Sequence, residues 1–213
     1  MLPIFREKTL KDKAYEQIKA RIVSGEWAGG TFLTEKYLSD LLQMSKTPIR
    51  SALDRMEMNG LVKLSPKQGI VVQEVSLKKV LEIYELRLSL ETFAARHLTG
   101  KLTQKYYDIF DENLEAQAKA IHAEDIVHYV ELDEKFHGML ISGLGNDEFN
   151  DVMARIQDKF LMAVRVKFIK NKTRLWESYT EHQGIRSALA GNDPQMTEAL
   201  VAKHIEYVKT IML

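Results

Sequence analysis

Apolar residues recur at helical spacing along most of this chain, and its front part contains three such segments. In "TLKDKAYEQIKARIV" an apolar residue stands at every fourth position from Leu10 to Ile22, which predicts a helix that ends at Gly25. A second helix is predicted over "TEKYLSDLLQM", with Thr34 as its N-cap. The third covers "SKTPIRSALDRMEMNGLV", with Ser45 as its N-cap, and the short turn between the two is typical of a helix-turn-helix.

After Gly60 the pattern changes from helical spacing to β-rich runs. "LVKL" and "GIVVQEV" flank the turn signal "SPKQG", and together they predict a short hairpin. Three helices followed by a two-stranded ribbon form the pattern of a winged helix-turn-helix. We therefore expect an N-terminal winged helix-turn-helix domain over residues 1–75.

From Ser76 onward strand signals disappear, glycine and proline become sparse, and long amphipathic segments follow one another. They are separated by the breaks "TGKLT", "HAED", "GLGND", "KNK" and "AGNDP". The predicted helices cover residues 76–98, 103–121, 124–143, 147–170, 172–190 and 194–212. We therefore expect a mainly α protein whose second domain, residues 76–213, is an all-α antiparallel helical bundle of about six helices.

Composition narrows the class of protein. The 213 residues include no cysteine, so disulfides and thiolate metal ligands are excluded, and any metal must be held by His, Asp or Glu. No apolar stretch approaches the roughly 20 residues that span a bilayer, and the apolar start of the chain is too short for a secretory signal. We therefore expect a soluble, cytoplasmic protein with no membrane partner.

Charge is unevenly divided along the chain, although the total is zero. Residues 1–75 hold 12 Lys and Arg against 9 Asp and Glu, a net charge of +3, and residues 76–213 hold 18 against 21, a net charge of −3. This is the sign expected if the first domain meets phosphate and the second does not.

The third predicted helix has the residues that a recognition helix needs. Its apolar positions can pack inward, which leaves hydroxyls and cations near its start for the major groove of DNA. We expect Arg50 to contact guanine, and Lys67 and Gln68, at the tip of the ribbon, to meet a minor groove or the backbone. The alternative is that each is an ordinary solvated position. The expected DNA contacts are Lys36, Ser45, Lys46, Thr47, Arg50, Arg55, Lys67 and Gln68.

The stretch "GTFLTEKYLSDLLQMSKTPIRSALDRMEMNGLVKLSPKQGIVV" resembles the DNA-binding domain of the GntR superfamily of bacterial transcription regulators. Its part "SKTPIRSALDRMEMNGLV" matches the signature of that domain nearly completely. The resemblance implies binding to double-stranded DNA. The family often has arginine at the positions of Lys36 and Lys46, and lysine lacks the planar fork of arginine, so no operator sequence is carried over from arginine-bearing relatives.

Four donor residues in the second half of the chain can face a common interior. Asp133 and His137, in "DEKFH", lie one helical turn apart, and His182 and His204 lie at or beside the apolar faces of two further predicted helices. Three imidazoles and one carboxylate suit Zn, Ni, Fe or Mn. The alternatives are that Asp133 and His137 form a surface or semi-buried hydrogen-bonded pair, and that the histidines are ordinary core residues. No role is assigned to His97, His122 or His128.

The region from Ser76 onward resembles the all-helical ligand-binding domain of the FadR subfamily, the FCD type. The resemblance rests on "ELRLSLE" (85–91), "DEKFH" (133–137), "EHQGIRSAL" (181–189) and "HI" (204–205). In such regulators the matching Asp and three His hold a divalent metal, and a small carboxylate effector completes its coordination. The resemblance implies Zn as the first candidate metal, with Ni, Mn or Fe as the others, held by Asp133, His137, His182 and His204.

Two cations are candidates for binding the carboxylate of an effector. Arg87 lies on the first helix of the predicted bundle, and its guanidinium matches a carboxylate in geometry. Arg165, in "MAVRVKF", is a second cation inside an apolar helix. For Arg87 the alternative is a surface ion pair with Glu91, four residues further along the same helix.

These features lead to one main hypothesis and two rivals. The main hypothesis is a homodimeric transcription regulator, acting as a repressor, whose binding to a palindromic operator is modulated by a small organic acid at a divalent metal site. The first rival is a metal-dependent enzyme acting on a small carboxylate. A di-iron bundle is one form of it, but that needs two Glu-x-x-His motifs, and the chain has one, at 134–137. The second rival is an interaction module with histidines in its core. Because an enzyme would leave residues 1–75 unexplained, we expect a regulator and not an enzyme.

Overall fold

The computed structural model describes residues 9–65, 69–168 and 172–212. The chain divides into two compact units, Met1–Val75 and Ser76–Leu213. Each unit has its own buried apolar core.

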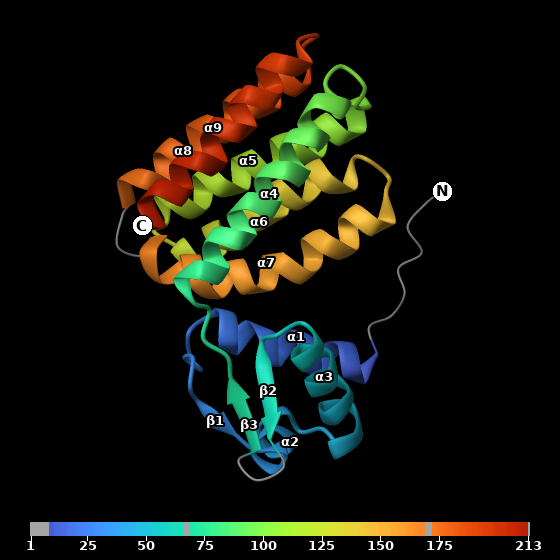
Figure 1. Ribbon diagram of the computed structural model, residues 1–213, viewed down its shortest axis with the longest axis vertical. Helices are drawn as coiled ribbons and strands as arrows, with labels where there is room; N and C mark the ends of the chain where they lie inside the picture. Colours follow the sequence, from blue (N-terminus) through green and yellow to red (C-terminus); the bar gives the residue numbers. More distant parts are fainter. Residues whose placement is uncertain (1–8, 66–68, 169–171, 213) are drawn as a thin grey trace. The chain divides into compact units, whose positions relative to one another are not determined.

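The described part of the N-terminal unit contains three helices and a small sheet (Figure 1). The strands pair antiparallel in the order β1-β3-β2, and α1 packs against α3. The buried core of this unit includes Ala14, Ile18, Ile49 and Met56. The elements are α1 (Leu10–Val23), β1 (Phe32–Leu33), α2 (Glu35–Leu42), α3 (Lys46–Met58), β2 (Val62–Ser65) and β3 (Gly69–Val72).

The helices of this unit begin where the sequence predicts. The side chain of Thr34 caps α2 by accepting a hydrogen bond from the backbone N–H of Tyr37 at 3.1 Å. Ser45 occupies the N-cap position of α3 with extended backbone angles, but its side chain makes no capping hydrogen bond. The start of α3 therefore follows the prediction, whereas the stabilising bond expected from a capping serine is missing.

The sheet contains one strand that the residue pattern does not predict. In β1, Phe32 pairs with Val71 and Leu33 pairs with Ile70, so the expected hairpin of β2 and β3 becomes a three-stranded sheet. Gly69 begins β3 with a φ of 82°, and a Cβ atom there would come within 2.9 Å of the Leu33 carbonyl oxygen. Glycine is thus required at this position for β1 to lie against β3.

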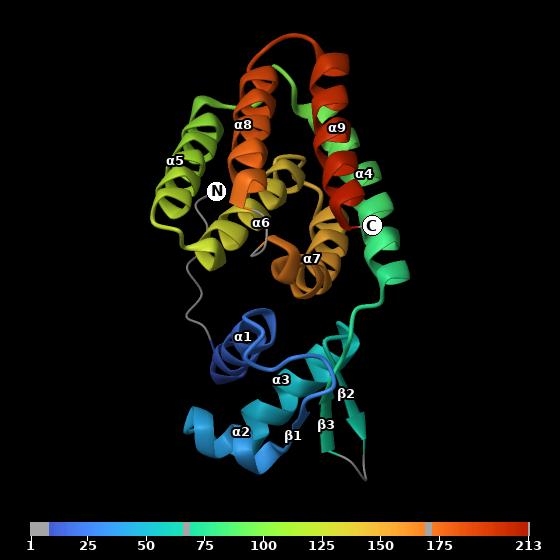
Figure 2. The same cartoon turned by 90° about the vertical axis from the view of Figure 1, so that its left-hand side faces the viewer.

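The second unit is a bundle of long helices (Figures 1 and 2). Each described helix begins and ends within two residues of its predicted bounds. Helix α4 packs along α9, α5 packs between α6 and α8, and α6 also contacts α7. The helices are α4 (Leu77–Leu98), α5 (Gln104–His122), α6 (Ile126–Ser142), α7 (Asp147–Phe168), α8 (Lys172–Leu189) and α9 (Pro194–Met212).

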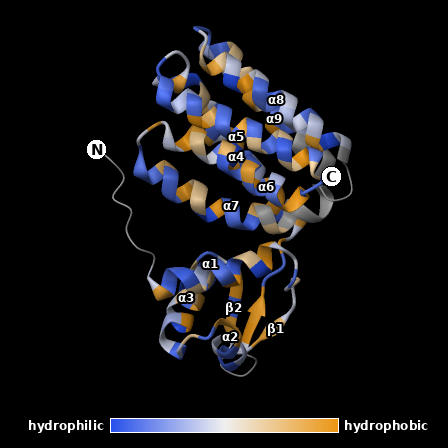
Figure 3. Cartoon of the chain, turned by 180° about the vertical axis from the view of Figure 1, so that it is seen from behind, coloured by the Kyte–Doolittle hydropathy of each residue, from blue (hydrophilic) through white to orange (hydrophobic). Residues whose placement is uncertain are grey.

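The protein is therefore mainly α, with a winged helix-turn-helix followed by a helical bundle, as predicted. Figure 3 shows that hydrophilic residues predominate on the outward faces of the bundle helices. A search of the described residues finds no helix with the length and apolar character needed to cross a membrane.

The interior of the bundle also holds charged and polar side chains, which is unusual for a helical core. They come from α4, α5, α6, α8 and α9, and from α7 through Asp158, and all of them are almost completely shielded from solvent. The set includes Arg87, Glu91, Asn113, Gln117, Asp133, His137, Arg174, His182 and His204.

Candidate functional site

The four residues predicted to hold a metal meet inside the bundle. One donor atom from each of Asp133, His137, His182 and His204 lies within 4.8 Å of the others, and all four residues are buried. The closest approach is 3.2 Å, between the Nε2 atoms of His137 and His204. Asp133 Oδ1 lies 3.6 Å from His182 Nε2, and Asp133 Oδ2 lies 3.9 Å from His137 Nε2.

Three helices bring these donors together. Asp133 and His137 project from one face of α6 because they are four residues apart, while His182 comes from α8 and His204 from α9. Phe136 stacks on the ring of His182, with ring centroids 4.1 Å apart. The imidazoles are therefore held by packing as well as by hydrogen bonds.

Two of the imidazoles contact a carboxylate through their Nδ1 atom. His137 Nδ1 lies 2.5 Å from Glu91 Oε2, and His204 Nδ1 lies 2.6 Å from Glu181 Oε2. Burial raises the pKa of each carboxyl group, but neighbouring cations and hydrogen bonds offset this and hold both pKa values at about 2. Because an ionised carboxylate only accepts hydrogen bonds, both Nδ1 atoms carry a proton, and in the neutral form of each ring Nε2 presents a lone pair.

The third imidazole contacts a side-chain amide through its Nδ1 atom. His182 Nδ1 lies 3.0 Å from Gln117 Oε1. Gln117 Nε2 donates to Asn113 Oδ1 at 2.7 Å, and Asn113 Nδ2 donates to the carbonyl oxygen of Leu132 at 3.1 Å. A carbonyl oxygen accepts only, so this chain of bonds fixes both amide orientations. His182 Nδ1 is therefore the donor, and its Nε2 is left as an acceptor.

The residues fit a divalent metal. Three lone pairs and a carboxylate face one another, and His182 Nε2 is buried with no hydrogen-bond partner among the described residues. Burial lowers the pKa of His182 and His204, so neither ring supplies a positive charge of its own at neutral pH. Atoms that bind one metal at about 2.0–2.2 Å lie roughly 3 to 3.5 Å apart. The spacings of 3.2, 3.6 and 3.9 Å are close to this range, and the four donors all lie within 4.8 Å of one another. A cation at the centre would satisfy all four donors at once.

Two buried arginines pair with the supporting carboxylates. Arg87 Nε donates to Glu91 Oε1 at 2.7 Å, and Arg174 Nη2 donates to Glu181 Oε2 at 2.7 Å. Arg87 is 4% exposed, so its pair with Glu91 is a buried one and not the surface ion pair considered from the sequence. The predicted second effector residue, Arg165, lies on α7, but its side chain is outside the described part of the structure.

Sequence reasoning missed several members of this cluster. Gln117 and Asn113 interrupt the apolar face of α5 at helical spacing, and that interruption was a signal that could have identified them. Glu181 stands directly before His182 in the sequence, and it does not interrupt an apolar helix face in the way that Gln117 and Asn113 do. Arg174 begins α8 in a polar stretch, where nothing in the pattern marks it as buried.

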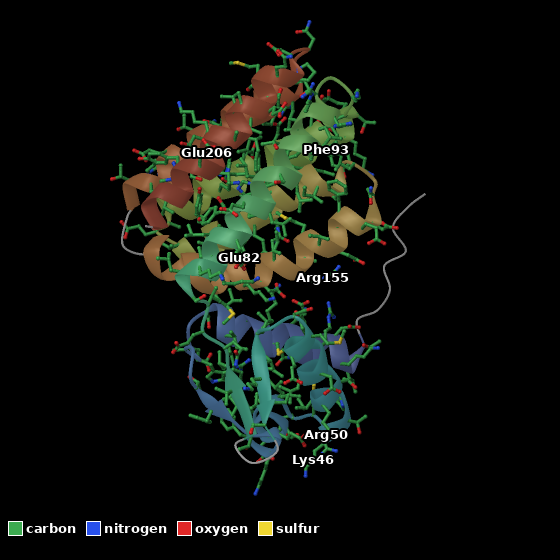
Figure 4. All side chains as sticks on the ribbon, viewed as in Figure 1. Lys46, Arg50, Glu82, Phe93, Arg155 and Glu206 are labelled. Atoms are coloured by element: carbon green, nitrogen blue, oxygen red, sulfur yellow. The ribbon has the colours of Figure 1, made fainter. Side chains whose placement is uncertain are left out.

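The expected DNA-binding residues that the structure describes lie at the surface of the N-terminal unit. Figure 4 shows Lys46 and Arg50 near one another on α3. Arg50 Nε lies 2.8 and 2.9 Å from the two carboxylate oxygens of Glu35, a residue that the sequence did not single out. Lys67 and Gln68 lie outside the described residues. Exposed positions are Lys36, Ser45, Lys46, Thr47, Arg50 and Arg55.

Arg55 differs from the other exposed cations of α3. Its guanidinium lies 4.1 Å from the centroid of the Tyr15 ring, and its Nη1 is 3.7 Å from Asp12 Oδ1. Both contacts are to α1, near the end of α3 opposite to Lys46. Arg55 thus helps to join α3 to α1, a structural role beside the expected contact with DNA.

Comparison with known proteins finds a matching family model for each of the two units. The family model of bacterial regulatory proteins of the gntR family matches residues 10–72, and the FCD domain model matches residues 82–207, more than half of the chain. The chain belongs to the GntR family of bacterial regulatory proteins. Its second unit is an FCD domain, a type that binds ligands.

Relatives of this GntR-family protein are transcription regulators. It is 30% identical over 146 residues to the uncharacterized HTH-type transcriptional regulator YdhC of Bacillus subtilis, which covers 68% of this chain and 65% of that protein. It is 25% identical over 203 residues to the HTH-type transcriptional repressor RspR of Escherichia coli, covering 93% of this chain and 87% of that one. The gluconate operon transcriptional repressor of Bacillus subtilis is 29% identical over 171 residues, 78% of this chain and 68% of that one.

Solved structures share the fold of this GntR-family chain. Escherichia coli McbR/YncC superposes with a TM-score of 0.86 at 21% identity, covering 97% of this chain and 98% of that one. A putative GntR regulator from Rhodococcus sp. RHA1 superposes with a TM-score of 0.83 at 18% sequence identity, covering 95% of this chain and 96% of that one. GntR-family members are transcription regulators and not enzymes, so the expectation that this chain is not an enzyme is confirmed.

Proposed function

We propose that this GntR-family regulator is a homodimeric repressor that holds one divalent metal through Asp133, His137, His182 and His204. Zinc is the first candidate, since three imidazoles and a carboxylate suit it well. A small organic acid binds at this metal and alters binding to a palindromic operator. Residues 1–75 bind DNA, and residues 76–213 bind metal and acid and form the dimer.

The proposal of a metal rests on one observation. Three imidazoles direct unprotonated Nε2 atoms toward one carboxylate, while each Nδ1 is held by its own acceptor, Glu91, Gln117 or Glu181. Such outer partners fix the tautomer and the ring orientation of a metal-bound histidine. Histidines that served only as core residues would not need three separately fixed tautomers that face one point.

The proposal of an acid rests on charge. Arg87 and Arg174 are buried near the ligands, and a guanidinium matches a carboxylate in geometry. Arg165 stays a candidate on the same grounds as in the sequence. Because one relative is named as a gluconate operon repressor, sugar acids are the first set to test.

Linkage explains how an acid can control DNA binding. An acid changes the operator affinity only by the difference in its own affinity for the two conformations of the dimer. Two recognition helices must meet half-sites roughly 34 Å apart, or a multiple of it, so a modest change in their spacing is enough to weaken binding. Lys36, Ser45, Lys46, Thr47, Arg50, Arg55, Lys67 and Gln68 are the residues proposed to contact DNA.

Native mass spectrometry of the purified protein tests the metal and the dimer together. We expect a dimer with one divalent metal per chain, and we expect Asp133→Ala and His204→Ala to lose the metal. His97→Ala, a histidine outside the cluster, is the matched control and should keep it. A wild-type protein that takes up neither zinc nor nickel would contradict the proposed metal site.

A gel-shift assay on the promoter region of the protein's own gene tests the regulatory part. We expect binding to one fragment in preference to a shuffled sequence of equal length, and a change of affinity when gluconate or a related acid is added to the metal-loaded protein. Equal affinity for both fragments would contradict sequence-specific regulation.

A further inference from the structure

The four predicted metal ligands are buried, so an ion can reach them only past the side chains that surround them. Two of the residues that support the ligands, Glu91 and Gln117, are fully buried themselves. The third, Glu181, has a side chain that is 29% exposed. This is more than for any of the four ligands, of which Asp133 is the most exposed, with 11% of its side chain. Glu181 is therefore the supporting residue that reaches solvent.

Glu181 lies where α8 meets α9, two helices that run side by side (Figure 2). Arg174, Glu177 and Glu181 follow one another at spacings of three and four residues on α8, so they share one face of it. Glu181 Oε2 lies 2.6 Å from His204 Nδ1 on α9. The guanidinium carbon of Arg174 lies 4.7 Å from the ring centroid of Tyr207, also on α9. We call these five residues the α8–α9 seam.

Arg174 closes the seam. It is almost completely buried, and the partly exposed ring of Tyr207 covers its guanidinium. One of its terminal nitrogens, Nη2, donates to Glu181 Oε2 at 2.7 Å. An aromatic face over a guanidinium attracts it and shields it from water. Tyr207 therefore holds Arg174 in place, and Arg174 holds Glu181.

Arg174 has a second carboxylate within reach. Its other terminal nitrogen, Nη1, lies 3.8 Å from Oε2 of the exposed Glu177. A buried charge that loses its partner is costly, whereas a move from Glu181 to Glu177 leaves Arg174 paired. Both hydrogen bonds of Glu181 go to Oε2, and its Oε1 makes none to the described residues. A shift of Arg174 to Glu177 thus releases Glu181, with Oε1 available as a ligand atom for a cation.

Two other sides of the cluster suit a cation less well than the seam. On the side of α4, the buried guanidinium of Arg87 is bonded to Glu91, and its positive charge repels a cation. One helical turn from the ligands along α6, α8 and α9, the buried side chains are apolar and offer nothing to replace the water that an ion would lose. These apolar residues are Ile141, Ile185 and Val201. The seam, in contrast, contains two carboxylates and one arginine, a net charge of −1 with a neutral imidazole.

We infer that a divalent ion reaches the proposed metal site through the α8–α9 seam, with Glu181 as its first ligand and Arg174 under Tyr207 as the gate. One imidazole ring, that of His204, separates Glu181 from the cluster, because Glu181 contacts Nδ1 while Nε2 faces the other donors. This inference rests on the proposed metal site. It names residues that admit the ion and that are not among its four final ligands.

The substitution Tyr207→Ala removes the ring over Arg174 and should open the gate. We expect zinc uptake by the metal-free protein, and zinc release into excess chelator, to become about ten-fold faster, as for the loss of one cation–π contact to a buried guanidinium. Since a gate slows both rates by the same factor, their ratio, the Kd, should change by no more than about two-fold. Stopped-flow fluorescence with a zinc indicator measures both rates.

Two further variants control for other effects of this change. Tyr207→Phe keeps the ring and should exchange zinc at the rates of wild type. Phe93→Ala removes an aromatic ring that is as exposed as Tyr207, 44% in each case, but that lies on α4 outside the seam. It should leave both rates unchanged. Rates in Tyr207→Ala that equal those of wild type, or an equal rise in Phe93→Ala, would overturn the gate.

The substitution Glu181→Gln tests the first ligand. We expect its zinc uptake to be about ten-fold slower, because a unit negative charge that attracts a divalent ion at contact is lost. Glu91→Gln is the matched comparison, since Glu91 also supports a ligand histidine but lies away from the seam. It should weaken zinc binding through faster release, with uptake like that of wild type.

These rates also separate the inference from the function on which it rests. If Glu181→Gln takes up zinc as fast as Glu91→Gln does, Glu181 is not the first ligand. If wild type takes up no zinc and no other divalent ion, the proposed metal site itself is wrong.

Discussion

Glu91 connects two residues with different proposed roles. One of its oxygens accepts from Arg87, which faces the proposed acid, and the other lies against His137, which faces the proposed metal. Its pKa of about 2 means that it is ionised at neutral pH, despite burial, because Arg87 and His137 stabilise the charge. Removing that charge should therefore disturb both neighbours.

We expect Glu91→Gln to destabilise the helical unit by about 3 kcal/mol, because it leaves the buried Arg87 without its counter-charge. Metal affinity should fall by roughly 10-fold to 100-fold, the usual effect of losing an outer partner of a ligand. Urea unfolding is measurable in a Trp27→Phe background, since Trp176 is then the only tryptophan. Glu82→Gln, at an exposed ion pair on the same helix, is the control and should change neither quantity. Unchanged metal affinity in Glu91→Gln would contradict the supporting role.

The residues that face the centre of the site were more predictable than those that support them. Asp133 and His137 are one turn apart on an amphipathic helix, and His182 and His204 lie by apolar faces, so periodicity indicated that they could converge. A supporting residue needs only an acceptor near Nδ1, and the chain can supply it from any helix. Gln117 reaches His182 across 65 residues of sequence, and no spacing rule connects such a pair.

Helix α3 presents two cations with different surroundings. Arg50 donates its Nε–H to Glu35 at the start of α2, and this bond orients the guanidinium. The two terminal nitrogens of Arg50 do not take part in the bond to Glu35. The pair also lowers the pKa of Glu35, chiefly through the hydrogen bond from Arg50. No ion pair with Lys46 is found among the described residues. Arg50 is thus suited to reading a base, and Lys46 to meeting phosphate.

The substitutions Arg50→Ala and Lys46→Ala should separate these two roles. We expect Arg50→Ala to weaken operator binding about ten-fold or more while leaving the affinity for shuffled DNA nearly unchanged. Lys46→Ala should weaken both and lower the slope of log K against log salt by about one. Fluorescence anisotropy at several salt concentrations measures both effects. A uniform loss across sequences in Arg50→Ala would remove it from the base-reading set.

At the scale of elements, the helices were predictable and the shortest strand was not. Helices such as α4 and α7 contain several turns of repeated apolar spacing, and their bounds follow from it. Strand β1 has two residues, too few for any alternation to be seen, and it exists because Phe32 and Leu33 find a pairing edge on β3. Its formation depends on tertiary contact, which the local pattern does not contain.

On the scale of the whole molecule, the proposed metal joins α6, α8 and α9 and should stabilise the helical unit. Ligand binding to the folded state adds about 2.7 kcal/mol when the free metal is at 100 times its Kd. We expect a chelator to lower the melting temperature of wild type and His97→Ala but not of Asp133→Ala. Differential scanning fluorimetry with and without added zinc measures this. If the melting temperature of wild type changes with neither chelator nor added zinc, the histidines serve only as core residues.

The position of the ligands along the chain also has a consequence for biosynthesis. His137 and His204 are 67 residues apart, so the ribosome needs several seconds, at roughly 5–20 residues per second, to supply the last donor after the first pair is made. During most of that interval a nascent chain has only Asp133 and His137 of the four donors, and two donors on one helical turn hold a divalent ion weakly; His182 adds a third donor before His204 is made. We therefore expect loading of the proposed metal to be a late step in the production of this regulator, because a chain released before His204 is made lacks one of the four ligands.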